Sequence, residues 1–96
     1  MTAALHAEEI LHPGVVVSHF KRDLTEGEEN RYLYKIIGVG IHTETKEELV
    51  IYQALYGDHG IYCRPKEMFL SPVDTEKYPD AKQHWRLELY SSPSRR

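Results

Sequence analysis

Two long apolar segments lie close together in this chain, and their spacing limits what it can fold into. Residues 32–42 and 49–56 are rich in Tyr, Val and Ile, which are typical of β-strands, and the polar segment 43–47 connects them. Parallel strands need a crossover of a dozen or more residues, usually a helix. We find no room for such crossovers, so the sequence excludes a parallel α/β sheet and predicts an antiparallel all-β fold.

Shorter strands are predicted on both sides of this pair. Pro13 and Gly14 form a turn that begins a strand over 15–20, and the turn formers of residues 57–60 predict a hairpin into 61–64. Pro65 suits the start of a helical turn over 65–69, from which Met68 and Phe69 would enter the core. With a closing strand within 83–90, the chain has five or six short strands, and a small antiparallel barrel or roll would leave no exposed edges.

The segment 32–42 has apolar residues on both faces, which predicts a central strand. Gly38 and Gly40 interrupt it and indicate a bend or a close approach of backbone. The segment 24–30 is acidic, carries a glycine and is predicted to be a mobile, solvated loop.

The chain of 96 residues is predicted to be one domain. Residues 13–90 form that domain in this interpretation, with a flexible N-terminal segment over 1–12 and a flexible C-terminal tail over 91–96.

Composition restricts location and partners. The excess of 15 acidic over 12 basic residues gives a formal charge of -3, which does not favour nonspecific nucleic-acid binding. One cysteine cannot form an internal disulfide, and we find no signal peptide or membrane-spanning segment. We therefore expect a cytoplasmic protein without a membrane role, cofactor or metal.

Several motifs in a fixed order allow a comparison with known families. They are Pro13-Gly14, His19-Phe20-Lys21, Tyr34-Lys35-Ile36 with Gly38, His42-Thr43-Glu44-Thr45 with Glu47, Tyr52 to Asp58, and Arg64 to Phe69. With these motifs the chain resembles the DUF1653 family, small bacterial domains of unknown function. The resemblance implies an SH3-like β-barrel or roll, and supplies neither an activity nor a catalytic residue. Cys63 stands where the family commonly has valine, which implies a small buried hydrophobic residue.

Metal and thiol chemistry have little support in the sequence. His42 and Glu44 form the His-x-Glu of zinc deaminases, but the Pro-Cys-x-x-Cys that completes such a site is missing. The structural alternative is that His42 and Glu44 cap a hairpin and bind its backbone. Cys63 lies four residues from His59, and nothing in the sequence requires them to meet.

Arg64 has two interpretations. Its planar guanidinium suits a carboxylate or phosphate ligand, and Pro65 would brace its position. Alternatively, it forms an internal ion pair with Glu67 or Glu44 that holds the turn against the sheet.

The tyrosines provide the best candidate site. Four of them could form an aromatic patch that stacks bases or binds a proline-rich peptide, or they could be buried in the core. They are Tyr34, Tyr52, Tyr56 and Tyr62. His19, His42 and Arg64 would be its polar rim, with Glu44 beside His42.

We therefore predict a noncatalytic binding module for a peptide, a protein surface or a small polar ligand, acting as a monomer or weak homodimer. One alternative is an RNA-associated factor, which rests on fold analogy alone. Another is an unrecognised metal-dependent or hydrolytic enzyme. No catalytic residue is predicted.

Overall fold

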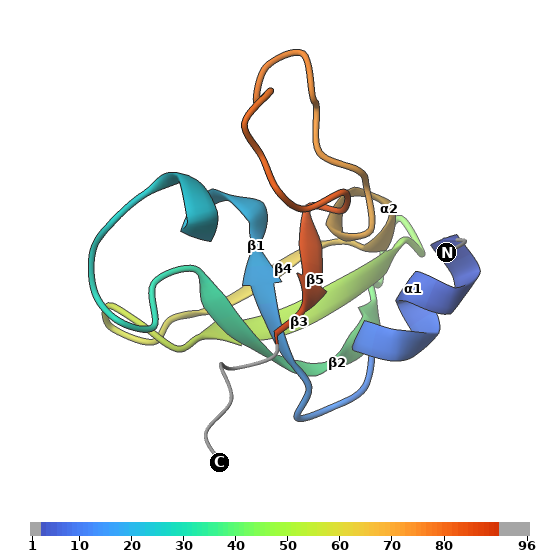
Figure 1. The fold of residues 1–96 in the computed structure, drawn as a ribbon. Helices are drawn as coiled ribbons and strands as arrows, with labels where there is room; N and C mark the ends of the chain where they lie inside the picture. The colour runs from blue at the N-terminus through green and yellow to red at the C-terminus, as the bar shows by residue number, and fades with distance from the viewer. Residues whose placement is uncertain (1–2, 91–96) are drawn as a thin grey trace.

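The computed structural model describes residues 3–90 and contains a five-stranded antiparallel sheet with the strand order β4-β3-β2-β1-β5 (Figure 1). The elements are α1 (Ala3–Ile10), β1 (Val16–His19), the 3-10 helix η1 (Phe20–Leu24), β2 (Leu33–Ile41), β3 (Glu48–Ala54), β4 (Ile61–Pro65), α2 (Lys66–Phe69) and β5 (Leu87–Leu89). The predicted all-β class, the five strands and the helical turn are confirmed. The tail predicted over 91–96 lies outside the described residues.

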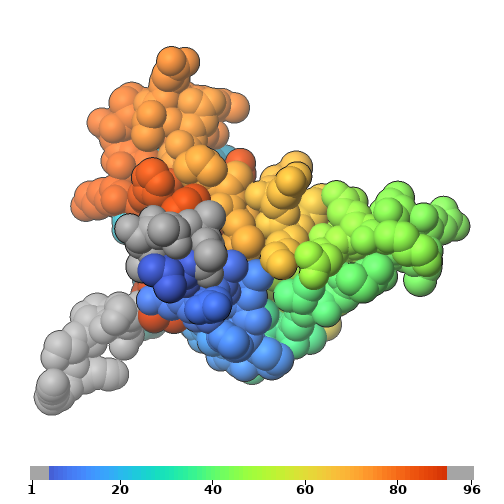
Figure 2. Space-filling view, turned by 90° about the vertical axis from the view of Figure 1, so that its right-hand side faces the viewer, coloured from blue at the N-terminus to red at the C-terminus, as the bar shows by residue number. Residues whose placement is uncertain are grey.

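β2 is the central strand, as its two apolar faces predict. Tyr34 lies opposite Val17 of β1 and opposite Ala54 of β3. The register of β2 with β3 shifts between Ile36 and Gly38, which is the irregularity that glycine in a strand indicates. Beyond this bulge β2 pairs with β3 alone, so the β2–β3 hairpin (green in Figure 2) projects from the body of the molecule.

The sheet does not close into a barrel. β4 pairs only with β3 and β5 pairs only with β1, so both are edge strands. The edges are kept short: β5 has 3 residues, and β4 ends at Pro65, which has no N–H to donate. The side chain of Cys63 is exposed, and the prediction that it is a small buried residue is wrong because Cys63 lies on an edge strand whose first three residues are all exposed.

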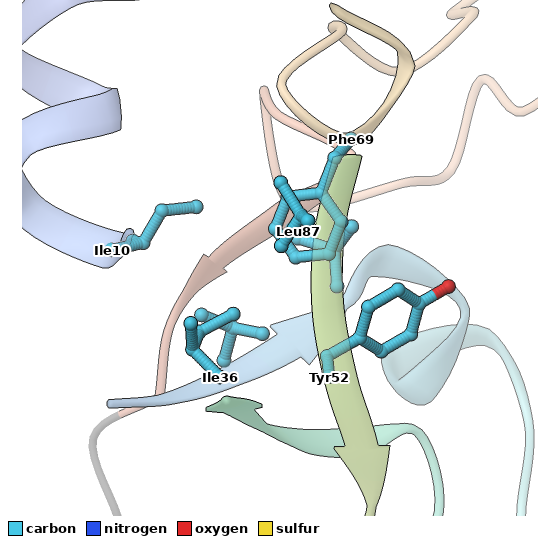
Figure 3. Close-up of a cluster of buried hydrophobic side chains, with 7 residues drawn as sticks. Ile10, Ile36, Tyr52, Phe69 and Leu87 are labelled. Carbon is cyan, nitrogen blue, oxygen red and sulfur yellow. The ribbon is translucent and has the colours of Figure 1, made fainter. Parts of the chain in front are cut away.

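Seven buried side chains form the core, and Figure 3 shows how they converge from both helices and four strands. They are Ile10, Val17, Ile36, Val50, Tyr52, Phe69 and Leu87. Phe69 is fully buried, as predicted, whereas Met68 is 48% exposed and does not enter the core. A single helical turn presents only one face to the sheet, and Phe69 occupies it.

The N-terminal segment contributes to this core. α1 covers most of residues 1–12, which were predicted to be flexible and outside the domain. His6 and Ile10 are one helical turn apart, and both are buried against the sheet. The packed domain therefore begins before Pro13. α1 has 8 residues, and within residues 3–90 no helix has the length and apolar character needed to cross a membrane.

The acidic loop over 24–30 is bound by two arginines. The guanidinium of Arg31 donates hydrogen bonds to the carbonyls of Thr25 and Arg22, and that of Arg22 donates to the carbonyl of Glu29. Glu28 extends across to the β3–β4 turn, where its carboxylate accepts from the Gly57 amide at 3.2 Å. The acidic side chain of Glu28 thus stabilises a turn.

Burial of α1 can be tested by truncating one side chain. Ile10→Ala should lower the free energy of unfolding by about 2–4 kcal/mol, because it removes a fully buried side chain and leaves a cavity. Leu5→Ala on the same helix is the matched control: Leu5 is 55% exposed, so its truncation should cost under about 0.5 kcal/mol. Urea unfolding measures both values, and equal small effects would contradict the packing of α1.

Candidate functional site

Four of the eight predicted site residues line one pocket of about 180 Å³. These four are His19, Tyr34, Tyr52 and Arg64, which come from β1, β2, β3 and β4. The complete lining is His19, Lys21, Tyr32, Tyr34, Tyr52, Arg64 and Leu87. We call it the tyrosine pocket.

The tyrosines are partly core and partly pocket wall. Tyr52 is buried in the core cluster, and in Figure 3 its hydroxyl points away from the other labelled side chains. The ring of Tyr34 meets that of Tyr52 edge-on at 5.2 Å, and its hydroxyl lies 2.9 Å from that of Tyr56. Burial, followed by the hydrogen bond to Tyr56, raises the pKa of the Tyr34 hydroxyl, which therefore remains a neutral group at physiological pH.

Tyr56 and Tyr62 lie beside the pocket and do not line it. Tyr56 follows the end of β3 and contacts two residues of the pocket wall, Tyr34 and Tyr32. Tyr62 is 49% exposed, and its ring lies 6.0 Å from that of Tyr52. Tyr62 therefore belongs to the surface next to the site.

His42 and Glu44 do not belong to the rim of this pocket. They lie in the turn between β2 and β3, at the opposite end of β2 from Tyr34. Nδ1 of His42 accepts hydrogen bonds from the amides of Glu44 and Thr45, so His42 caps the hairpin, as the structural alternative proposed. The prediction of a shared site is wrong here because the long β2 strand separates these residues.

Arg64 forms neither of the ion pairs that the sequence suggested. Across residues 3–90 the structure has one ion pair, between Lys66 and Glu48 at 3.2 Å. Nε of Arg64 instead donates to the hydroxyl of Tyr52 at 3.4 Å. Among the described residues its guanidinium therefore has no carboxylate at ion-pair distance, so its charge is available to a ligand.

His19 is held as a neutral donor. Its Nδ1 accepts the backbone N–H of Lys21 at 3.1 Å, so the proton of the neutral ring is assigned to Nε2. Burial lowers the pKa of His19 to about 4, and the charges of Arg86, Arg64 and Lys21 act in the same direction. At neutral pH the ring is uncharged.

Three residues that the sequence did not mark also line the pocket: Lys21, Tyr32 and Leu87. Lys21 lies in η1, which brings its side chain to the site. Tyr32 was assigned to a strand, but its φ of 61° lies in the left-handed region, which is uncommon for a bulky residue. Its ring lies 5.6 Å from His19 and 5.7 Å from Tyr56. No signal in the sequence marks this backbone conformation.

A larger cavity of about 680 Å³ lies between α1 and β5. The ring of His6 stacks on Trp85 at 4.6 Å, and burial lowers the pKa of His6. The carboxylate of Glu88 accepts hydrogen bonds from the amides of His84 and Trp85. The stack of His6 on Trp85 attaches α1 to the segment before β5, and none of the predicted site residues lines this cavity.

The metal and thiol interpretations can be compared with the positions of the described residues. Residues 3–90 hold no cluster of three or more His, Cys, Asp or Glu arranged to bind a metal ion. Cys63 alternates along β4 with Tyr62 and Arg64, so it points to the opposite face of the sheet from the pocket.

Comparison with known proteins identifies a family. A family model described as a protein of unknown function (DUF1653) matches residues 15–89. No curated protein and no solved structure matches the chain.

Protonation of His19 should weaken the fold. The unfolded ring titrates near 6.5 and the folded ring near 4, so between these values the unfolded chain binds more protons and stability falls as pH falls. Between about pH 7.5 and 4.5, the wild type should lose about 2 kcal/mol more than His19→Asn, after allowance for the partial exposure of the ring. Asparagine retains an acceptor for the Lys21 amide.

Urea unfolding across this pH range measures the effect. His42→Asn is the matched control, because His42 also accepts backbone amides through Nδ1 but lies exposed in a turn. An identical pH dependence in the wild type and His19→Asn would show that His19 is not held neutral.

Proposed function

The chain belongs to the DUF1653 family of proteins of unknown function, and from the geometry of its own side chains we propose that it is a noncatalytic binding module for a small polar ligand. One observation carries this proposal: Arg64 lines a pocket walled by tyrosines, and within residues 3–90 it has no carboxylate at ion-pair distance. A guanidinium next to aromatic walls can bind a polar group while the rings hold the rest of a ligand.

The dimensions of the pocket favour a small ligand over a peptide. A volume of about 180 Å³ is below the range of roughly 300–1,000 Å³ found for drug-sized ligands. Peptide recognition by aromatic grooves requires an extended surface for several residues. Tyr52, which could have formed such a surface, is buried in the core.

The polar groups of the pocket favour binding over catalysis. General acid–base catalysis is most efficient when the pKa of the catalytic group lies near the working pH. The pKa of His19 is lowered to about 4 and that of Tyr34 is raised, so both remain neutral hydrogen-bonding groups at pH 7. None of the described residues that line the tyrosine pocket carries a carboxylate.

The pocket is preorganised, which supports the same function. Tyr34 and Tyr52 are fixed by edge-on ring contact, and His19 is fixed by its bond to the Lys21 amide. Tyr32 keeps a left-handed backbone conformation, and uncommon conformations of this kind cluster at ligand sites. A rigid site loses less entropy when it binds a ligand.

The proposal can be tested by NMR with neutral, phenol-sized polar fragments as probes. We expect shifts of the amides of Tyr34, Tyr52 and Arg64. Arg64→Gln should lower the affinity for the best-binding fragment at least about fivefold, because it removes the guanidinium donors. Arg64→Lys keeps the charge without the planar fork and should give an intermediate loss.

Lys35→Gln is the matched control. Lys35 is the neighbour of Tyr34 on β2 and is exposed on the opposite face, so its substitution should leave fragment binding unchanged. Shifts confined to the cavity around His6 and Trp85, or no shifts at all, would rule out the tyrosine pocket as the binding site.

A further inference from the structure

A second pocket adjoins the tyrosine pocket and shares His19, Lys21 and Arg64 with it. It has a volume of about 300 Å³ and lies between η1 and the segment that connects α2 to β5, which forms the upper loop in Figure 1. Four cationic side chains line it: Lys21, Arg64, Lys77 and Arg86. We call it the cationic pocket.

The positive charges of this pocket are poorly compensated. Asp74 is the only carboxylate among the described residues that line it, and one oxygen of Asp74 accepts hydrogen bonds from the amides of Glu76 and Lys77. Arg86 donates through Nε to the hydroxyl of Ser71 at 3.1 Å, which carries no charge. Four cations against one carboxylate leave a local excess of positive charge in a chain whose formal charge is -3.

The walls of the pocket are connected and hold these charges near one another. The amide of Phe20 in η1 donates to the carbonyl of Arg86 at 3.0 Å, and the rings of Phe20 and Tyr78 meet edge-on at 4.8 Å. Nζ of Lys21 and Nζ of Lys77 each lie 5.6 Å from the centre of the Tyr78 ring. Like charges held in one place repel each other, and a bound anion removes that cost.

Neutral His19 adds a donor at the junction of the two pockets. Its Nδ1 is occupied by the Lys21 amide, so Nε2–H is the side of the ring that can donate to a ligand. Among residues 3–90 the structure gives Nε2 no hydrogen-bond partner.

We propose that the cationic pocket binds the phosphate group of a small molecule whose remaining part occupies the tyrosine pocket. The claim that one ligand spans both pockets rests on the proposed function. Phosphate fits better than a carboxylate because the donors come from β4, η1 and the loop before β5, on different sides of the pocket. A planar carboxylate is satisfied by one guanidinium, whereas the oxygens of a phosphate accept from several directions.

The experiment titrates the whole chain with three probes while amide shifts are recorded: inorganic phosphate, phenol and phenyl phosphate. Phosphate should shift the amides of His19, Lys21 and Arg86, and phenol should shift those of Tyr34 and Tyr52. Phenyl phosphate should shift both sets and bind at least about tenfold more tightly than phosphate alone, because the two groups are linked.

Charge-removing variants locate the phosphate site. Lys77→Gln and Arg86→Gln should each lower the affinity for phenyl phosphate by about three- to tenfold, since each removes one cation from the pocket. Lys82→Gln is the matched control, because Lys82 is in the same loop but does not line the pocket. Equal weakening by all three variants would show only a general charge effect and would overturn the proposal.

Failure of this inference can be distinguished from failure of the proposed function. Phenol shifts without phosphate shifts would overturn the phosphate site and leave the tyrosine pocket supported. Phosphate shifts without phenol shifts, or phenyl phosphate no tighter than phosphate, would support the cationic pocket as a phosphate site and overturn the single ligand that spans both.

Two further probes identify the source of the anion. Acetate that binds as tightly as phosphate would overturn the choice of phosphate over carboxylate. A short single-stranded RNA that displaces phenyl phosphate, with affinity falling at least about tenfold between roughly 50 and 200 mM salt, would assign the pocket to a nucleic-acid backbone and overturn the small-molecule ligand. No displacement by RNA would support the small-molecule phosphate.

Discussion

Hydrogen bonding of β2 to a strand on each side fixes where the other elements lie. The first half of β2 pairs with both β1 and β3, so it lies in the centre of the sheet and contributes Tyr34 and Ile36 to the buried face. The bulge after Ile36 ends this double pairing, and the second half continues with β3 alone. The body that holds both pockets and all of the core except Val50 is therefore distinct from the hairpin beyond the bulge, whose turn His42 caps. β2 contributes to both the body and the projecting hairpin, and the bulge lies at the boundary between them.

Tyr52 connects the core to the candidate site. Its ring packs on Phe69 at 5.2 Å and belongs to the buried cluster, while its hydroxyl accepts a hydrogen bond from Arg64. A change in the position of Arg64 would therefore disturb a well-packed ring. In so small a domain the same side chain has to serve both purposes, because there are too few residues to build a separate scaffold around a site.

The distribution of charge matters more here than its total. The chain is acidic overall, yet four cations gather around one end of the sheet, while Glu28 binds the β3–β4 turn and Glu48 pairs with Lys66. Glu28 and Glu48 thus interact with other parts of the molecule. The total charge argues against nonspecific binding to nucleic acid. It does not describe the potential in one concave site, where a low dielectric strengthens the interaction of each charge with a ligand.

The sequence by itself determined the all-β class, the central position of β2, the family and the burial of Phe69. These depend on alternation, turn residues and motif order, which are local properties of the chain. It also identified His19, Tyr34, Tyr52 and Arg64, because aromatic and polar residues on neighbouring strands share a face. Only the tertiary structure decided that β4 and β5 remain edges, that α1 packs its buried face on the sheet, and that Lys21 and Arg86 join His19 while His42 does not. The physical reason is that each of these outcomes depends on contacts between segments far apart in the chain, or on a backbone turn such as that of Tyr32, and neither leaves a periodic signal in the sequence.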